Sequence, residues 1–210
     1  MKKSLLFVFL AFVVSPLFCQ DNLWINFIHK FETCSLPIFT DTISFKYLNT
    51  QNNKNIISLE EFNYFIKDSC ETFWKYRTYD QNQKSFFEYD ALCKFAIDQD
   101  KTGIILTRNY FDDDESKEKG DYLLYIFDSK GNKLSYLPIG GERNDNFVSD
   151  IHFDQIAYNS TIYKNYSIEM KTEAYLWKDG KDGKAHISKK YYKIEDGKII
   201  NVPSAQCSMQ

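Results

Sequence analysis

The stretch of the chain with the most evident chemistry is DIHFD, residues 150–154. Side chains alternate along a β-strand, so Asp150, His152 and Asp154 would share one face of a strand and their two apolar neighbours the other. An imidazole flanked by carboxylates can bind a metal ion or serve as a general base. The same alternation is typical of an ordinary strand with one face in the core and one in water. No third liganding segment accompanies the motif, so the ordinary strand is preferred, and we expect neither a metal ion nor a cofactor.

Three further polar stretches fall between predicted strands. DQDKTG, residues 98–103, has the oxygen side chains and the glycine that open a calcium loop, but the twelfth position is Asn109, so a tight turn is preferred. DDDE, residues 112–115, predicts a solvated loop tip. GGERND, residues 140–145, suits either a recognition loop or a wide connection between strands, and the connection is preferred.

The longer motifs of catalysis do not occur in the sequence. The chain contains no GxSxG, no HExxH, no glycine-rich phosphate loop and no dinucleotide fingerprint. We therefore assign no catalytic residue. A hydrolase that works with paired carboxylates stays open, because paired acids leave no local signature.

The cysteines bear on cross-linking and on the compartment. After Cys19, the chain contains Cys34, Cys70, Cys93 and Cys207, at spacings of 36, 23 and 114 residues that lack the close pairs of a zinc site. In an oxidising compartment four cysteines allow three pairings. We prefer Cys34–Cys70, because each of these two residues follows a predicted helix. Cys93 lies on a predicted strand and is expected to be a small buried hydrophobe.

Residues 1–19 predict a secretory signal peptide. Two lysines precede an apolar run of ten residues, 5–14, whereas a membrane span takes about 20. Cleavage after Cys19 is preferred over a lipid anchor on Cys19, because the bulky Phe18 stands where a lipoprotein signal has a small residue. Removing this leader, which has no acidic residue, lowers the net charge from −3 to −5. That mild acidity argues against nucleic acid as a partner, and no later segment is apolar for long enough to cross a membrane.

The front section, residues 20–85, predicts two short helices. The first has one apolar face at Trp24, Phe27, Ile28 and Phe31, and Pro37 prevents its continuation. The second begins at Ser58, with Glu61 as its capping-box partner. Its apolar stripe is Leu59, Phe62, Phe65 and Ile66. A short strand around residues 43–47 is expected between the helices.

From residue 86 to residue 202 the apolar period changes to two. Nine apolar runs alternate with clusters of Gly, Asp and Asn that favour hairpin turns. In order, the runs are FFEYDALCKFAI, GIILTRNYF, DYLLYIFD, KLSYLPI, FVSDIHF, TIYKNYSIEM, TEAYLW, ISKKYYKI and GKIINV. We predict one α+β, mostly β domain over residues 20–210, with 203–210 as a tail. Its two short N-terminal helices would pack on a curved antiparallel β-meander of about eight or nine strands.

Three segments in this order, FIHKFETCSLPI, YLLYIFDSKGNKLSYLPIGG and YYKIEDGKII, carry a resemblance. The chain resembles small exported proteins of Bacteroidota-type bacteria. Those proteins share an early F-I-x-K-F…L-P segment, a K-G-N turn and a closing Y-x-I-x-x-D-G-K-I hairpin. The resemblance implies a location in the bacterial envelope, and it brings no activity and no catalytic residue with it.

These observations favour a non-enzymatic binding or interaction module, exported to the periplasm or the cell exterior. Tyrosine and tryptophan, which are common at recognition surfaces, are abundant on the predicted sheet. The partner would be a protein or a small ligand, and an immunity-type protein that neutralises a toxin is one version. The alternatives are a barrel-like carrier of a small apolar ligand and a metal- or carboxylate-dependent hydrolase around Asp150, His152 and Asp154.

Overall fold

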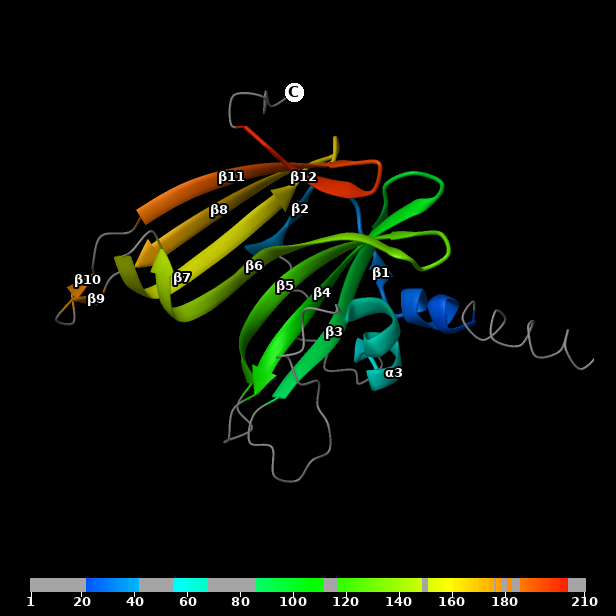
Figure 1. Cartoon of the computed structure of the whole chain (residues 1–210), viewed down its shortest axis with the longest axis horizontal. Helices are drawn as coiled ribbons and strands as arrows, with labels where there is room; N and C mark the ends of the chain where they lie inside the picture. The colour runs from blue at the N-terminus through cyan, green and yellow to red at the C-terminus, as the bar shows by residue number, and fades with distance from the viewer. Residues whose placement is uncertain are drawn as a thin grey trace, which may run out of the picture.

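The computed structural model describes residues 22–41, 55–67, 86–111, 117–148, 151–175, 177–178, 181–182 and 186–203. Most of these residues belong to one ten-stranded sheet, and two short helical segments pack on it (Figure 1). The prediction of a mostly β protein with two short helices is confirmed.

The strands of the sheet follow one another along the chain. The antiparallel meander consists of β3 (Phe86–Ala96), β4 (Lys101–Phe111), β5 (Lys117–Asp128), β6 (Lys133–Val148), β7 (Ile151–Ile162) and β8 (Ser167–Tyr175). Strand β11 (His186–Glu195) pairs with β8, and β12 (Lys198–Val202) pairs with β11. The two-residue strands β9 (Trp177–Lys178) and β10 (Lys181–Asp182) form a separate hairpin.

The described strands form an open sheet. Its terminal strands are β1 (Glu32–Thr33), which precedes β3 in the strand order, and β12. The closed barrel on which the ligand-carrier alternative depended is therefore not formed by these strands.

Strand β6 belongs to both halves of the sheet. Its residues 133–140 pair with β5 and its residues 141–148 pair with β7, and Figure 1 shows the two halves diverging from this strand. Gly141, at the change of partner, has φ 146°, and a Cβ added there would lie 2.7 Å from Oδ1 of Asp121. Only glycine combines this backbone angle with so close an approach. The GGERND stretch is thus part of a strand, and the predicted connection between strands is wrong.

Strands β4 and β5 are buried on both faces. On β5, Leu123, Tyr125 and Phe127 face the helical segments, whereas Leu124 and Ile126 face the second half of the sheet. That second half covers them with Ile162, Ile168 and Ile194. Continuous apolar runs such as YLLYIF are typical of strands buried on both faces. The space between the two halves is therefore filled by side chains along these strands.

The first helical segment, residues 22–29, presents the predicted apolar face to the sheet. Trp24, Phe27 and Phe31 are buried, and Ile28 packs against the same cluster. The ring centroids of Trp24 and Phe127 are 5.2 Å apart. Aromatic contacts of this kind account for the position of the segment over β5.

The second helical segment begins with the predicted capping box. Ser58 N donates to Glu61 Oε2 (2.7 Å), and Glu61 N donates to Ser58 Oγ (3.2 Å). The α-helix α3 (Leu59–Glu61) continues as the π-helix η2 (Phe62–Ile66), whose residues Phe62, Phe65 and Ile66 are buried. Leu59, which is predicted to lie on the same stripe, is 44% exposed. Leu59 is the first residue of α3, and the residues that cover the sheet lie further along, on η2.

Residues 32–39 join both halves of the sheet. Strand β1 pairs in parallel with β3, where Glu32 lies opposite Cys93, so the sheet is mixed and not wholly antiparallel. Strand β2 (Ile38–Phe39) pairs with β7, where Phe39 lies opposite Thr161. Strands of two residues are too short to show alternation, so the sequence did not predict them. The strand expected at 43–47 lies outside the described residues.

The turns of the second half also differ from the prediction. The run FVSDIHF is divided between the end of β6 and the start of β7, and TIYKNYSIEM contains the turn from β7 to β8. In that turn Tyr166 has φ 63°, and Asn165 Oδ1 accepts from Ser167 N (3.1 Å). A turn closed by one asparagine side chain needs no glycine. Apolar residues on both sides then gave the appearance of one strand.

Candidate functional site

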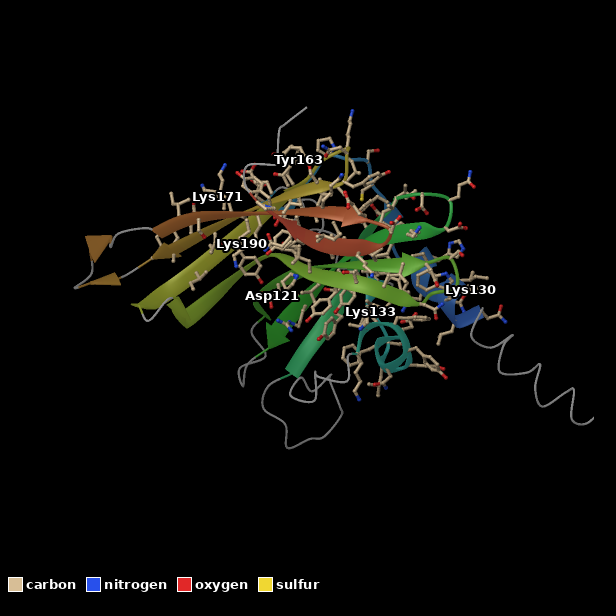
Figure 2. All side chains as sticks on the ribbon, turned by 45° about the horizontal axis from the view of Figure 1, so that its top comes forward. Asp121, Lys130, Lys133, Tyr163, Lys171 and Lys190 are labelled. Carbon is tan, nitrogen blue, oxygen red and sulfur yellow. The ribbon has the colours of Figure 1, made fainter. Side chains whose placement is uncertain are left out.

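A buried polar cluster, formed by Arg108, Asp121 and Tyr158, lies where the two halves of the sheet meet. Arg108 Nη2 donates to Asp121 Oδ2, and the hydroxyl of Tyr158 donates to Asp121 Oδ1 (2.5 Å). The three residues come from β4, β5 and β7, and each is at least nine-tenths buried. Figure 2 shows Asp121 below the strands of the second half.

A second set of polar contacts adjoins this cluster on β3 and β4. Asn109 Nδ2 donates to Asp90 Oδ2 (2.8 Å) and to Thr107 Oγ1 (3.3 Å). Arg108 and Asn109 are neighbours on β4, and both are buried because this strand is covered on both faces. Cross-strand register places Asn109 on the same face as Thr107 and Asp90, and Arg108 on the opposite face beside Tyr89.

The polar cluster has a structural role. Both carboxylate oxygens of Asp121 accept from protein donors, and the guanidinium of Arg108 balances its charge. A buried carboxylate that is paired and hydrogen-bonded avoids the large cost of an isolated buried charge. The cluster therefore fixes the junction between the two halves.

A broad polar surface among the described residues is the outer face of the second half of the sheet. Cross-strand register places alternate residues of β7, β8, β11 and β12 on this face. Its members are Asn159, Thr161, Glu169, Lys171, Glu173, Tyr175, Ile187, Lys189, Tyr191, Lys193 and Ile200. Ile187 and Ile200 are 56% and 43% exposed, which is unusual for isoleucine on a sheet. In Figure 2, Lys171 lies on this side of the strands and Lys190 on the other.

Ion pairs order the charged side chains of the outer face. Lys189 Nζ lies 2.5 Å from Glu169 Oε1, and Lys171 pairs with Glu173, which also accepts from the hydroxyl of Tyr175 (2.7 Å). Lys171 and then Tyr175 lower the pKa of the Glu173 carboxyl. The Glu169 carboxylate raises the pKa of the Lys189 ammonium. These lysines and glutamates thus neutralise one another within the outer face, and the pairs leave it neither strongly basic nor strongly acidic.

The residues of the DIHFD motif are only partly within the described structure. His152 and Asp154 lie at alternate positions on β7, as predicted, whereas Asp150 lies outside the described residues. Among the side chains that the structure describes, no group of three His, Cys, Asp or Glu residues is arranged to hold a metal ion. The metal-site interpretation of DIHFD stays a prediction.

The DQDKTG stretch is the tight turn that was preferred. Asp98 Oδ1 accepts from Asp100 N (2.8 Å), its Oδ2 accepts from Lys101 Nζ (2.8 Å), and β4 begins at Lys101. The Lys101 side chain and the Asp100 amide lower the pKa of the Asp98 carboxyl. The DDDE stretch lies outside the described residues.

Of the cysteines, the structure describes Cys34 and Cys93. Cys70 lies outside the described residues, as do Cys19 and Cys207, so the Cys34–Cys70 bridge stays a prediction. Cys93 is buried, as expected, and its Sγ lies 2.8 Å from that of Cys34. Strand β1, which brings these two residues together, has only two paired positions. A strand this short leaves no pattern in the sequence, so the contact could not be predicted.

Comparisons with known proteins add no assignment. No protein-family model, curated protein or solved structure matches the chain significantly. Within the described part of the chain, no helix has both the length and the apolar character needed to span a membrane.

Proposed function

We propose that this chain is a non-enzymatic binding module that contacts a protein partner through the outer face. The observation that carries the proposal is the pair of exposed isoleucines, Ile187 and Ile200, set among ordered ion pairs on a sheet face. Apolar residues surrounded by polar ones are typical of contact surfaces. Tyr175 and Tyr191, from β8 and β11, add the amphipathic area that recognition surfaces favour.

The balanced charge of the outer face favours a protein partner over nucleic acid. Binding to phosphates needs a cluster of unpaired basic side chains. Here Lys171 and Lys189 are each paired with a glutamate of the same face. A partner surface with complementary apolar and mixed charged groups fits this arrangement.

The proposal includes export, with cleavage after Cys19 and Gln20 as the first residue of the mature protein. Its support is the leader of residues 1–19. The intact mass of the denatured protein, taken from the envelope of its native host, tests this step. A mass starting at Gln20 supports a soluble exported domain, whereas a mass starting at Cys19 with acyl chains overturns cleavage after Cys19.

The binding proposal is tested by native mass measurement of the same preparation. The variant I187S/I200S should lose a protein adduct that the wild-type chain retains. The control is Tyr64→Ser, because Tyr64 is 63% exposed on η2 and lies outside the outer face. Loss of the adduct in the control, or its retention in the double variant, would contradict a role for the outer face.

A further inference from the structure

The thiols of Cys34 and Cys93 are placed to form a disulfide. Their Sγ atoms are 2.8 Å apart, and they are not bonded in the structure. A disulfide needs a separation of about 2.05 Å, so a small rotation of the side chains would bring the sulfurs to bonding distance.

Backbone pairing holds the two residues together. Strand β1 pairs with β3 so that Glu32 lies opposite Cys93 and Thr33 opposite Lys94. Immediately after β1, Cys34 N donates to Lys94 O (2.8 Å). Three successive residues of the front section are thus fixed against β3, and the Cys34 side chain is directed at Cys93 rather than at solvent.

Burial gives the two thiols different access to an oxidant. Cys93 is 1% exposed and lies in the core between the halves of the sheet, whereas Cys34 is partly exposed at the edge of that core. A reagent or an enzyme in solution therefore reaches Cys34 first. Cys93 is positioned to attack once Cys34 has reacted.

We propose that Cys34 and Cys93 form a structural disulfide when the chain meets a disulfide oxidant, either a protein oxidoreductase or a small-molecule disulfide. The Cys34 thiolate attacks one sulfur of the oxidant, which leaves a mixed disulfide and releases one thiolate. The Cys93 thiolate then attacks Cys34 Sγ and displaces the second thiolate. Cys34 and Cys93 together lose two protons and two electrons, and the disulfide of the oxidant is reduced to two thiol groups.

The bridge competes with the pairing predicted from the sequence. Cys34 can bond to Cys93 or to Cys70, and the structure places Cys93 beside it. A bond across 59 residues would restrict the unfolded chain and fasten the front section to β3. This inference does not depend on the outer face, because oxidation is tested on the isolated chain.

Peptide mapping identifies the bridge directly. The full chain is purified reduced, oxidised with glutathione disulfide, alkylated without reduction and digested with trypsin. Cys34, Cys93 and Cys70 fall in different peptides, 31–46, 85–94 and 68–75. We expect peptide 31–46 linked to peptide 85–94. Linkage of 31–46 to 68–75, or alkylation of both Cys34 and Cys93, would overturn the proposal.

Thermal unfolding provides a second measurement with matched variants. Oxidation should raise the midpoint of the wild-type chain by about 5–15 °C, the shift expected for a native disulfide in a domain of this size. Cys34→Ser, at the partly exposed position, should abolish this difference, whereas Cys70→Ser should retain it. A difference that survives in Cys34→Ser would show that another pair is responsible.

Discussion

The hydroxyl of Tyr158 donates to Oδ1 of Asp121 across 2.5 Å, and this hydrogen bond joins the two halves of the sheet. Asp121 lies on β5 and Tyr158 on β7, two strands that are separated by β6. Gly141 of β6 passes close to both groups, since a Cβ there would lie 3.2 Å from the Tyr158 hydroxyl. The glycine thus makes room for a contact between strands that do not pair.

The first prediction removes that hydrogen bond. Tyr158→Phe should lower the free energy of unfolding by about 1.5–3 kcal/mol, because the lost donor serves a buried charged acceptor. The measurement is urea denaturation followed by circular dichroism. Tyr175→Phe is the control: it removes a tyrosine hydroxyl that donates to Glu173 on the outer face, where the bond is only partly buried, and a smaller loss is expected. Equal losses in the two variants would contradict the structural role of the polar cluster.

The second prediction concerns Glu61, which is 4% exposed and serves two functions. Its Oε2 accepts from Ser58 N in the capping box and pairs with Lys30 Nζ (2.6 Å). Glu61→Ala should lower the free energy of unfolding by about 2–4 kcal/mol, because it removes the cap and leaves Lys30 without this partner. Glu61→Gln keeps an acceptor for the cap and should lose less.

The control for Glu61 is its neighbour Glu60, which is exposed. Glu60→Ala should change the free energy of unfolding by less than about 0.5 kcal/mol, as is usual at surface positions. A loss in Glu60→Ala as large as that in Glu61→Ala would show that general helix charge, and not the capping box, is responsible.

The third prediction concerns pH and the turn between β5 and β6. Partial burial acts to raise the pKa of the Asp128 carboxyl, but hydrogen bonds from Asn132 and Lys130 outweigh it and hold the pKa below 3.8. A lowered pKa in the folded state contributes stability that is present above pH 3.8 and is lost as the pH falls through the folded value. Asp128→Asn removes this contribution.

Urea denaturation of both chains between pH 2 and pH 7 measures the effect. The wild-type chain should be the more stable at neutral pH, and the difference should shrink below about pH 3.8. Asp100→Asn, in the exposed turn before β4, serves as the control for loss of one surface carboxylate. A difference that stays constant down to pH 2 would contradict this role of Asp128.

The sequence predicted those helix starts and turns that depend on residues close together in the chain. Ser58 and Glu61 marked a helix start because both partners of a capping box lie three residues apart, and Asp196–Gly197 marked the turn between β11 and β12 because positive φ is favoured there. The polar cluster could not be predicted in this way. Arg108 and Tyr158 are 50 residues apart, and only the three-dimensional arrangement of their strands brings them to Asp121. The GGERND stretch predicted a connection between strands, whereas Gly141 lies within β6 and permits a close approach there.

Residues 32–39 have a consequence for the order in which the protein assembles during synthesis. The ribosome makes this segment before any of the strands it pairs with, and Phe39 and its partner Thr161 are roughly 120 residues apart, a separation that makes the contact slow to form. The consecutive hairpins from β3 to β8 need only neighbouring strands and can form as the chain emerges. Residues 32–39 are therefore expected to dock last, and until then the preceding aromatic residues Trp24, Phe27 and Phe31 are open to chaperones.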